Sequence, residues 1–255
     1  MVHRNVYLLN GLELDAYWRA RAAWLWSGRD AVLVGHSAAA IMGVKWIPDD
    51  LPAELGRSKA RATDGVIVRS DAFAPDEVFR VGDMTCSTGA RTAYDLGRRL
   101  PFDTNIIRVD SVLNARRCSV DDVSRIADRY PGARGIRQLR RVLALADAGA
   151  ESPQETRLRL LLVRAGLTPI ITQIRVGNRR IDMGWPEYKV GVEYDGEQHW
   201  TNPDDYAKDI ERLEFLAAQG WIIVRVSSTQ LGFNPAHVVE RARRALVSRG
   251  YVRSV

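Results

Sequence analysis

Cysteine and long apolar runs are scarce in this sequence, and each scarcity excludes a class of protein. The 255 residues include only Cys86 and Cys118, too few for a disulfide framework and without the paired spacing of a zinc site. No apolar stretch approaches the length needed to cross a bilayer, and the N-terminal residues lack the basic, apolar and small-residue regions of a signal peptide. We therefore expect two reduced thiols in a cytoplasmic protein with no membrane partner.

Internal repeats and low-complexity tracts are also absent, which excludes solenoid and disordered architectures. A chain of 255 residues is long enough for two ordinary domains, each with its own hydrophobic core. The formal net charge of +6 favours an anionic partner, although many basic proteins bind nothing acidic. Charge alone therefore leaves nucleic-acid binding open.

A linker followed by a helix start is predicted in the segment DAGAESPQE, residues 147–155. Ser152 can cap the helix, and Glu155 completes an S-x-x-E capping box before an apolar stripe. We therefore predict a domain boundary here, with a first domain of α+β type over residues 1–148 and a second domain over residues 151–255.

The first domain mixes helical and extended patterns, and its chemistry is obscure. One strand is predicted over residues 64–70, from DGVIVRS. Helices are predicted over residues 14–26, 34–44, 86–100, 119–130 and 133–147.

The second domain has a clearer order of elements. Strands are predicted over residues 170–175, 179–184, 188–194 and 221–226, and helices over residues 205–218 and 235–248. With the helix after the linker, the predicted order is α-β-β-β-α-β-α.

Carboxylates gather near the end of the third of these strands, in the segment VGVEYDGEQHW. Side chains two residues apart share a face of a strand, so Glu193 and Asp195 project from one side. Asp182 lies on the preceding strand, and the turn WPEY makes the two strands an antiparallel pair. With Gly184 opposite Lys189, Asp182 and Glu193 become diagonal neighbours, about 7–8 Å apart at the backbone.

Crowded carboxylates repel one another unless a cation or a shared proton relieves them. Hard oxygen ligands of this kind suit Mg²⁺ or Mn²⁺, which bind one or two carboxylates together with water and substrate phosphate. Such an ion acidifies a water and neutralises charge on a phosphate, which is the chemistry of a metal-dependent nuclease. Gly196 would let the chain turn and bring Gln198 and His199 to the same sheet edge, where His199 could act as a base or orient the water.

Simpler interpretations compete at each of these positions. Glu155 is also explained as a helix-capping residue, and Glu193 as the partner of Arg180 in a cross-strand salt bridge. Asp195 before a glycine is typical of a turn, and a lone histidine is more often structural than catalytic. The occurrence of all these groups at one sheet edge favours the site.

The stretches RRIDMGWPEYKVGVEYDGEQHW and DYAKDIERLEFLAAQGWIIVRV, with Glu155 before them, carry a family resemblance. They resemble the bacterial domain-of-unknown-function family related to very-short-patch-repair (Vsr) endonucleases, in the PD-(D/E)XK superfamily, over residues 151–248. The resemblance implies a restriction-endonuclease-like αβββαβ core within an α/β protein, and Mg²⁺-dependent hydrolysis of DNA. It implies metal binding by Asp182 and Glu193, and it matches Glu155 to the acid of the first helix and His199 to the histidine after the glycine. Beyond the resemblance, we expect Asp195 to bind the metal with Asp182 and Glu193, Glu155 to support it, and His199 or Gln198 to orient the water, so all six are candidate catalytic residues.

This sequence departs from the superfamily at one position. Asp195 stands where the superfamily usually has the lysine that steadies the attacking water. The candidates to replace that lysine are Lys208, or Gln198 together with His199.

The first domain carries a second resemblance, in HRNVYLLNG and VLVGHSAAAIMGV. These stretches resemble the part that follows the winged helix in proteins with AbiEi-type antitoxin domains, although no winged helix is recognisable here. DNA contact is expected from Arg134, Arg137 and Arg141, which fall on nearly one helical face, and from Lys208 and Arg212 in the second domain. A solvated helix surface explains the three arginines equally well.

The expected partner is DNA, while a homodimer and a protein partner bound through the first domain stay open. The alternative to an enzyme is a non-catalytic DNA-binding or toxin–antitoxin-like regulator that keeps the nuclease fold as a scaffold.

Overall fold

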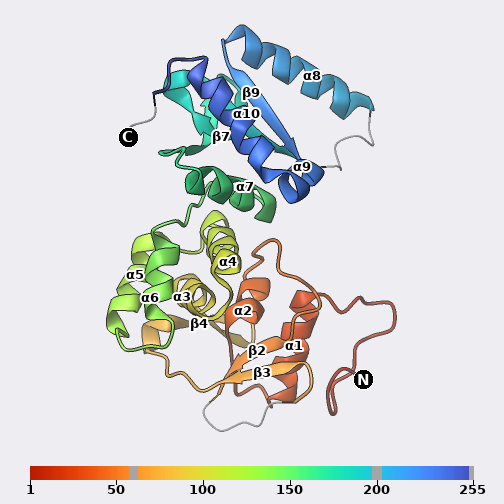
Figure 1. Cartoon of the computed structure of the whole chain (residues 1–255). Coiled ribbons are helices and arrows are strands. Elements are labelled where there is room, and N and C mark those ends of the chain that lie inside the picture. Colours follow the sequence, from red (N-terminus) through yellow and green to blue (C-terminus); the bar gives the residue numbers. More distant parts are fainter. Residues whose placement is uncertain (58–62, 197–202, 253–255) are drawn as a thin grey trace. The chain divides into compact units, whose positions relative to one another are not determined.

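The computed structural model describes residues 1–57, 63–196 and 203–252. The chain divides into two compact units, Met1–Ala148 and Gly149–Val255, which are described separately (Figure 1). Both units contain helices and a β-sheet, so the expected mixed α/β class is confirmed. No helix within the described ranges is long and apolar enough to cross a membrane.

The first unit is built around a five-stranded mixed sheet with the strand order β3-β2-β1-β5-β4. Its strands are β1 (Val32–Leu33), β2 (Ala53–Gly56), β3 (Val66–Arg69), β4 (Val78–Val81) and β5 (Met84–Ser87). Its helices are α1 (Ala16–Trp26), α2 (Gly35–Ile41), α3 (Gly89–Arg99), α4 (Phe102–Asn114), α5 (Val120–Arg129) and α6 (Ile136–Leu143), with a short 3-10 helix η1 (Pro75–Glu77). Trp24, Leu33 and Leu55 are among the side chains buried in its core.

Both cysteines belong to the first unit and are free thiols, as expected. Cys86 lies in the core, and burial raises its pKa to about 12. Burial, with a smaller contribution from Asp122, also raises the pKa of Cys118 to about 12. Because the thiolate is the reactive form and the metal ligand, neither side chain is suited to chemistry near neutral pH.

Helix α6 is shorter than the sequence predicts, and this corrects the expected arginine face. The helix begins at Ile136 because Gly135 has a left-handed backbone with φ of 84°. A Cβ atom on Gly135 would lie 2.3 Å from the carbonyl oxygen of Arg98. Arg134 therefore precedes the helix and shares no helical face with the other two arginines.

The second unit contains a four-stranded sheet with the strand order β6-β7-β8-β9. Its strands are β6 (Ile171–Val176), β7 (Arg179–Trp185), β8 (Val190–Asp195) and β9 (Ile222–Ser227), and η2 (Pro186–Tyr188) is a 3-10 turn. Its helices are α7 (Pro153–Arg164), α8 (Pro203–Ala218), α9 (Ser228–Phe233) and α10 (Pro235–Val247). Strands β6, β7 and β8 are successively antiparallel, whereas β9 returns parallel to β8 after α8.

Two hydrophobic clusters show which helices cover which face of this sheet. Leu158 and Leu162 of α7 pack with Val192 of β8 and with Val238 and Leu246 of α10 in the larger cluster. The smaller cluster joins Ile174 of β6, Ile181 of β7 and Leu216 of α8. Helices α7 and α10 therefore cover one face, and α8 covers the other (Figure 1).

The register of β7 against β8 differs from the prediction by two residues. Gly184 pairs with Gly191, not with Lys189, because Lys189 belongs to the connection and has a left-handed backbone with φ of 50°. Gly184 is needed at this position, since a Cβ atom there would lie 2.2 Å from the carbonyl oxygen of Val190. A shift of two residues keeps every side chain on its face, so the register moves Asp182 toward a position opposite Glu193.

Candidate functional site

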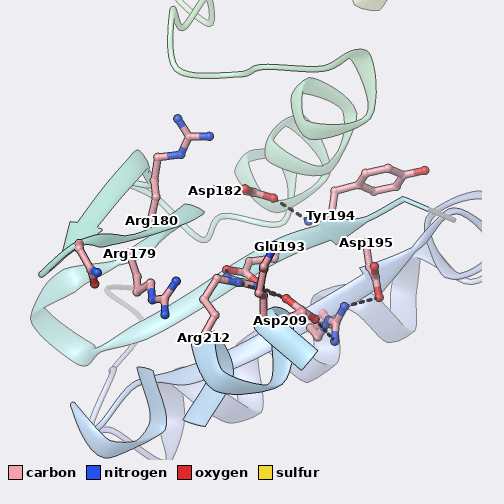
Figure 2. Close-up of a pocket in the computed structure, with 11 residues that line it drawn as sticks. Arg179, Arg180, Asp182, Glu193, Tyr194, Asp195, Asp209 and Arg212 are labelled. Carbon is pink, nitrogen blue, oxygen red and sulfur yellow. Dashed lines mark hydrogen bonds and ion pairs between the residues drawn. The ribbon is translucent and has the colours of Figure 1, made fainter. Parts of the chain in front are cut away.

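A cavity of about 650 Å³ opens beside β7, β8, β9 and α8 in the second unit (Figure 2). Of the 11 residues that line it, five are arginine or lysine and four are aspartate or glutamate. Three of the predicted site residues, Asp182, Glu193 and Asp195, are among the four acids, and Asp209 is the fourth. The cavity is therefore strongly polar, with charges of both signs close together.

Strand β7 is locally irregular at Asp182. Ile181 packs on the α8 side and Met183 on the α7 side, although residues two apart on a regular strand share a face. The neighbouring strand β6 has a matching distortion, because Gln173, between the paired residues Thr172 and Ile174, has a φ of 53°. Asp182 therefore lies between two residues that face opposite sides of the sheet, a local irregularity that regular strand geometry does not predict.

The carboxylate of Asp182 is mostly buried and lies close to two other acids. Its Oδ2 atom accepts a hydrogen bond of 3.0 Å from the backbone N–H of Tyr194 on β8. Burial, followed by the negative charges of Glu155 and Glu193, raises the pKa of Asp182 from 3.8 to about 7. Near neutral pH this side chain thus exchanges between its protonated and ionised forms, beside two other acids.

Glu155 combines a structural contact with a place in this acidic group. The hydroxyl of Ser152 caps helix α7 by accepting a hydrogen bond of 3.2 Å from the backbone N–H of Glu155. The Glu155 carboxylate accepts hydrogen bonds of 2.9 Å from the Ser152 hydroxyl and from the backbone N–H of Glu151, one residue before the position that a capping box uses. Burial, with a contribution from Glu151, still raises the pKa of Glu155.

Glu193 is 6% exposed and forms a two-bond ion pair with Arg212 of helix α8. The two nitrogen–oxygen distances are 2.5 and 2.9 Å. Arg180, the partner that cross-strand geometry predicts for Glu193, instead forms an exposed pair with Glu151, with two distances of 2.7 Å. The predicted Arg180–Glu193 bridge is therefore wrong.

Asp195 faces β9 instead of joining Asp182. Its Oδ2 atom lies 2.8 Å from Arg225, which also lies 3.0 Å from Asp209. Because Asp209 also pairs with Arg212 at 2.8 Å, these charges form one chain of alternating sign. This charge network comprises Glu193, Arg212, Asp209, Arg225 and Asp195, and its ion pairs are visible in Figure 2.

The network changes which acids are available to a cation. In the described part of the chain, no group of three histidine, cysteine, aspartate or glutamate side chains is arranged to hold a metal ion. Asp182, Glu193 and Asp195 therefore do not converge as the expected set of three ligands, because Arg225 holds Asp195. The carboxylates whose negative charges act on Asp182 are Glu155 and Glu193.

Residues 155–246 match the family model REase_MTES_1575. This is a restriction-endonuclease-like family, so residues 155–246 of the second unit are similar to a restriction-endonuclease-like domain. The uncharacterized protein MT2308 of Mycobacterium tuberculosis strain CDC 1551 / Oshkosh is 26% identical to this chain over 193 residues, which cover 74% of this chain and 70% of that protein. The uncharacterized protein Rv2248 of strain ATCC 25618 / H37Rv gives the same values. No solved structure matches the chain.

The remaining predicted site residues are dispersed. Gln198 and His199 lie outside the described residues. Lys208 and Arg212 line the cavity of the restriction-endonuclease-like domain. Arg137 and Arg141 lie on α6 of the first unit, where Arg141 stacks 4.8 Å above the ring of Phe102.

Several residues that line the cavity were not predicted as site residues, and three of them are the charged residues Arg179, Asp209 and Arg225. Arg225 had a signal, because parallel pairing of β8 with β9 brings it beside Glu193. Asp209 had one too, since it lies three residues before Arg212 on the predicted helix, a spacing at which opposite charges can pair. Arg179 had none beyond its position at the start of a strand.

Proposed function

We propose that the second unit is a metal-dependent endonuclease that hydrolyses phosphodiester bonds of DNA. The observation that carries this proposal is the carboxyl group of Asp182, whose pKa of about 7 reflects burial next to Glu155 and Glu193. Such a site gains from a cation that replaces the proton. The match of residues 155–246 to a restriction-endonuclease-like family supports the same reading.

Asp182 and Glu193 would hold the ion, Mg²⁺ or Mn²⁺, and Glu155 would support it. Two carboxylates suffice, because Mg²⁺ usually binds one or two carboxylates and completes its shell with water and substrate phosphate. When bound, the ion would supply an acidified water and neutralise charge on the phosphate. The backbone N–H of Tyr194 orients the Asp182 carboxylate, and Arg212 holds Glu193 in place.

Further predictions from the sequence, on the substrate, the activation of water, the first unit and a homodimer, belong to this proposal. The sequence resemblance to Vsr endonucleases favours DNA over RNA as the substrate. Water activation by Gln198 and His199, and an AbiEi-like first unit that binds DNA or a protein partner, are further proposals. A homodimer would convert single-strand cuts into double-strand cuts.

A second candidate function is a non-catalytic DNA-binding scaffold. The charge network favours it, because Arg212 and Arg225 already neutralise Glu193 and Asp195 without any metal ion. In that case Asp182 would stay protonated near neutral pH, and no ion would be needed. The two functions differ in whether the protein cuts DNA when a divalent ion is added.

A plasmid-cleavage assay separates the two functions. The purified chain is incubated with supercoiled plasmid in Mg²⁺, Mn²⁺ or EDTA, together with Asp182→Asn and the control Glu187→Gln, which removes an exposed acid from turn η2. If the protein is a nuclease, the wild type and Glu187→Gln nick or linearise the plasmid in Mg²⁺ or Mn²⁺, and Asp182→Asn is inactive. No cleavage by the wild type in either metal, or equal cleavage by Asp182→Asn, would contradict the proposed enzyme.

A further inference from the structure

Arg179 differs from the other arginines that line the cavity. Arg180 is paired with Glu151, and both Arg212 and Arg225 are held in the charge network. Arg179 makes no ion pair and no hydrogen bond through its side chain to any residue in the described ranges. Its positive charge is therefore available to a ligand.

The position of Arg179 directs its guanidinium into the cavity. Arg179 begins β7 and pairs with Val176 of β6. It lies two residues before Ile181, which packs on the α8 side, so alternation places Arg179 on the face that carries Glu193. Figure 2 shows the Arg179 side chain extending toward Glu193 and Arg212, whereas Arg180 points away from them.

The charges around Arg179 restrict the chemistry of a suitable ligand. The charge network holds three carboxylates and two guanidinium groups, and the carboxyl group of Asp182 lines the same cavity. A ligand at this place needs one anionic group for Arg179, and it must tolerate a cation at the neighbouring acids. A phosphodiester meets both requirements, because its oxygens can accept hydrogen bonds from a guanidinium and share a divalent ion.

We infer that Arg179 binds a backbone phosphate of a DNA substrate. This inference rests on the proposed function for its substrate class, but the contact itself needs no metal and no catalysis. Arginine suits the role because its planar group can donate two parallel hydrogen bonds to phosphate. A phosphate contact carries no sequence information, so Arg179 contributes affinity and position and leaves sequence preference unchanged.

The test is fluorescence-anisotropy titration of the full chain with a short labelled DNA duplex in EDTA, at several salt concentrations. Arg179→Gln removes the charge and Arg179→Lys keeps it. The matched control is Arg175→Gln, since Arg175 is an exposed arginine on the adjacent strand β6 that does not line the cavity. Thermal melting of each variant confirms that it is folded.

Arg179→Gln should weaken binding about ten-fold and lower the slope of log affinity against log salt by about 0.9, the loss of one phosphate contact. Arg179→Lys should keep most of the slope, and Arg175→Gln should change affinity less than about two-fold. Unchanged binding by Arg179→Gln, an equal loss in Arg175→Gln, or no DNA binding by the wild type would overturn the inference. A wild type that binds through Arg179 and never cuts would overturn only the proposed enzyme.

Discussion

Replacing Asp182 with asparagine should make the stability of the protein less dependent on pH. Asparagine keeps the size of the side chain and an oxygen that can accept the hydrogen bond from the Tyr194 backbone, while it cannot ionise. Since burial and the two neighbouring acids act against the charged form of Asp182, the wild-type protein loses stability when this group ionises. The variant has no such loss.

The size of the effect follows from the shift in pKa. The pKa of Asp182 rises from 3.8 to about 7 on folding, and each pKa unit corresponds to about 1.36 kcal/mol. Below pH 3.8 the carboxyl is protonated in both states and contributes nothing. Between the two values the folded state binds more protons than the unfolded state, so wild-type stability falls with rising pH. The variant should gain about 2 kcal/mol over the wild type near pH 5 and about 4 kcal/mol above pH 7.

Urea denaturation in EDTA measures this difference. The free energy of unfolding of the second unit is measured for both proteins at about pH 5, 7 and 9. The difference between the variant and the wild type should grow as the pH rises and then stay constant. EDTA is essential, because a bound ion would stabilise the wild type alone. Two parallel pH curves, or a variant that is less stable than the wild type above pH 7, would refute the reasoning.

Two further comparisons test the ion pairs and the close backbone contact. Glu193→Ala should lower the free energy of unfolding by about 3 kcal/mol, because it leaves Arg212 half-buried with one partner fewer. Glu151→Ala, at the exposed pair with Arg180, should lower it by less than about 1 kcal/mol. Equal losses in urea denaturation would show that burial of the ion pair is unimportant. Gly184→Ala should lower the free energy of unfolding by about 3 kcal/mol, because its Cβ atom meets the Val190 carbonyl. Gly196→Ala should lower it by less than about 1 kcal/mol, because a Cβ atom there meets nothing closer than 3.7 Å. A tolerated Gly184→Ala would contradict the close approach of β7 and β8.

Local patterns were sufficient to predict the four strands of the second unit and its helices α7, α8 and α10. Strand β7 was expected over residues 179–184 and spans Arg179–Trp185, and helix α10 was expected over residues 235–248 and spans Pro235–Val247. Period-two and helical apolar patterns, bounded by turn residues, carry this information directly. Helix α9 was missed because it is a single short turn directly after β9.

The first unit was harder to predict because much of it depends on long-range pairing. Strand β1, Val32–Leu33, has two residues and is held by neighbours on both sides, β2 and β5. No local pattern identifies a strand that short. Helix α4, by contrast, had a readable signal in the spacing of Ile106, Val109 and Leu113, all of which are buried.

The candidate site depends on contacts between elements that the pattern of one β-strand does not contain. The acids were identifiable from their spacing, but the positions of their partners were not, because Arg212 and Arg225 approach from α8 and β9. The register of β7 against β8 depends on the left-handed backbone of Lys189. The placement of Asp182 depends on a strand irregularity opposite Gln173. Both are distortions of regular geometry, and regular geometry is what a sequence pattern assumes.

Calorimetric titration with Mn²⁺ measures whether Asp182 takes part in binding a divalent ion. The titration is made without DNA at about pH 8, where Asp182 is mostly ionised, on the wild type, Asp182→Asn and the control Glu187→Gln. We expect saturable binding of Mn²⁺ by the wild type and Glu187→Gln, and a loss of that binding in Asp182→Asn. A wild type that binds no ion, or an Asp182→Asn variant that binds as tightly as the wild type, would show that Asp182 is not a metal ligand.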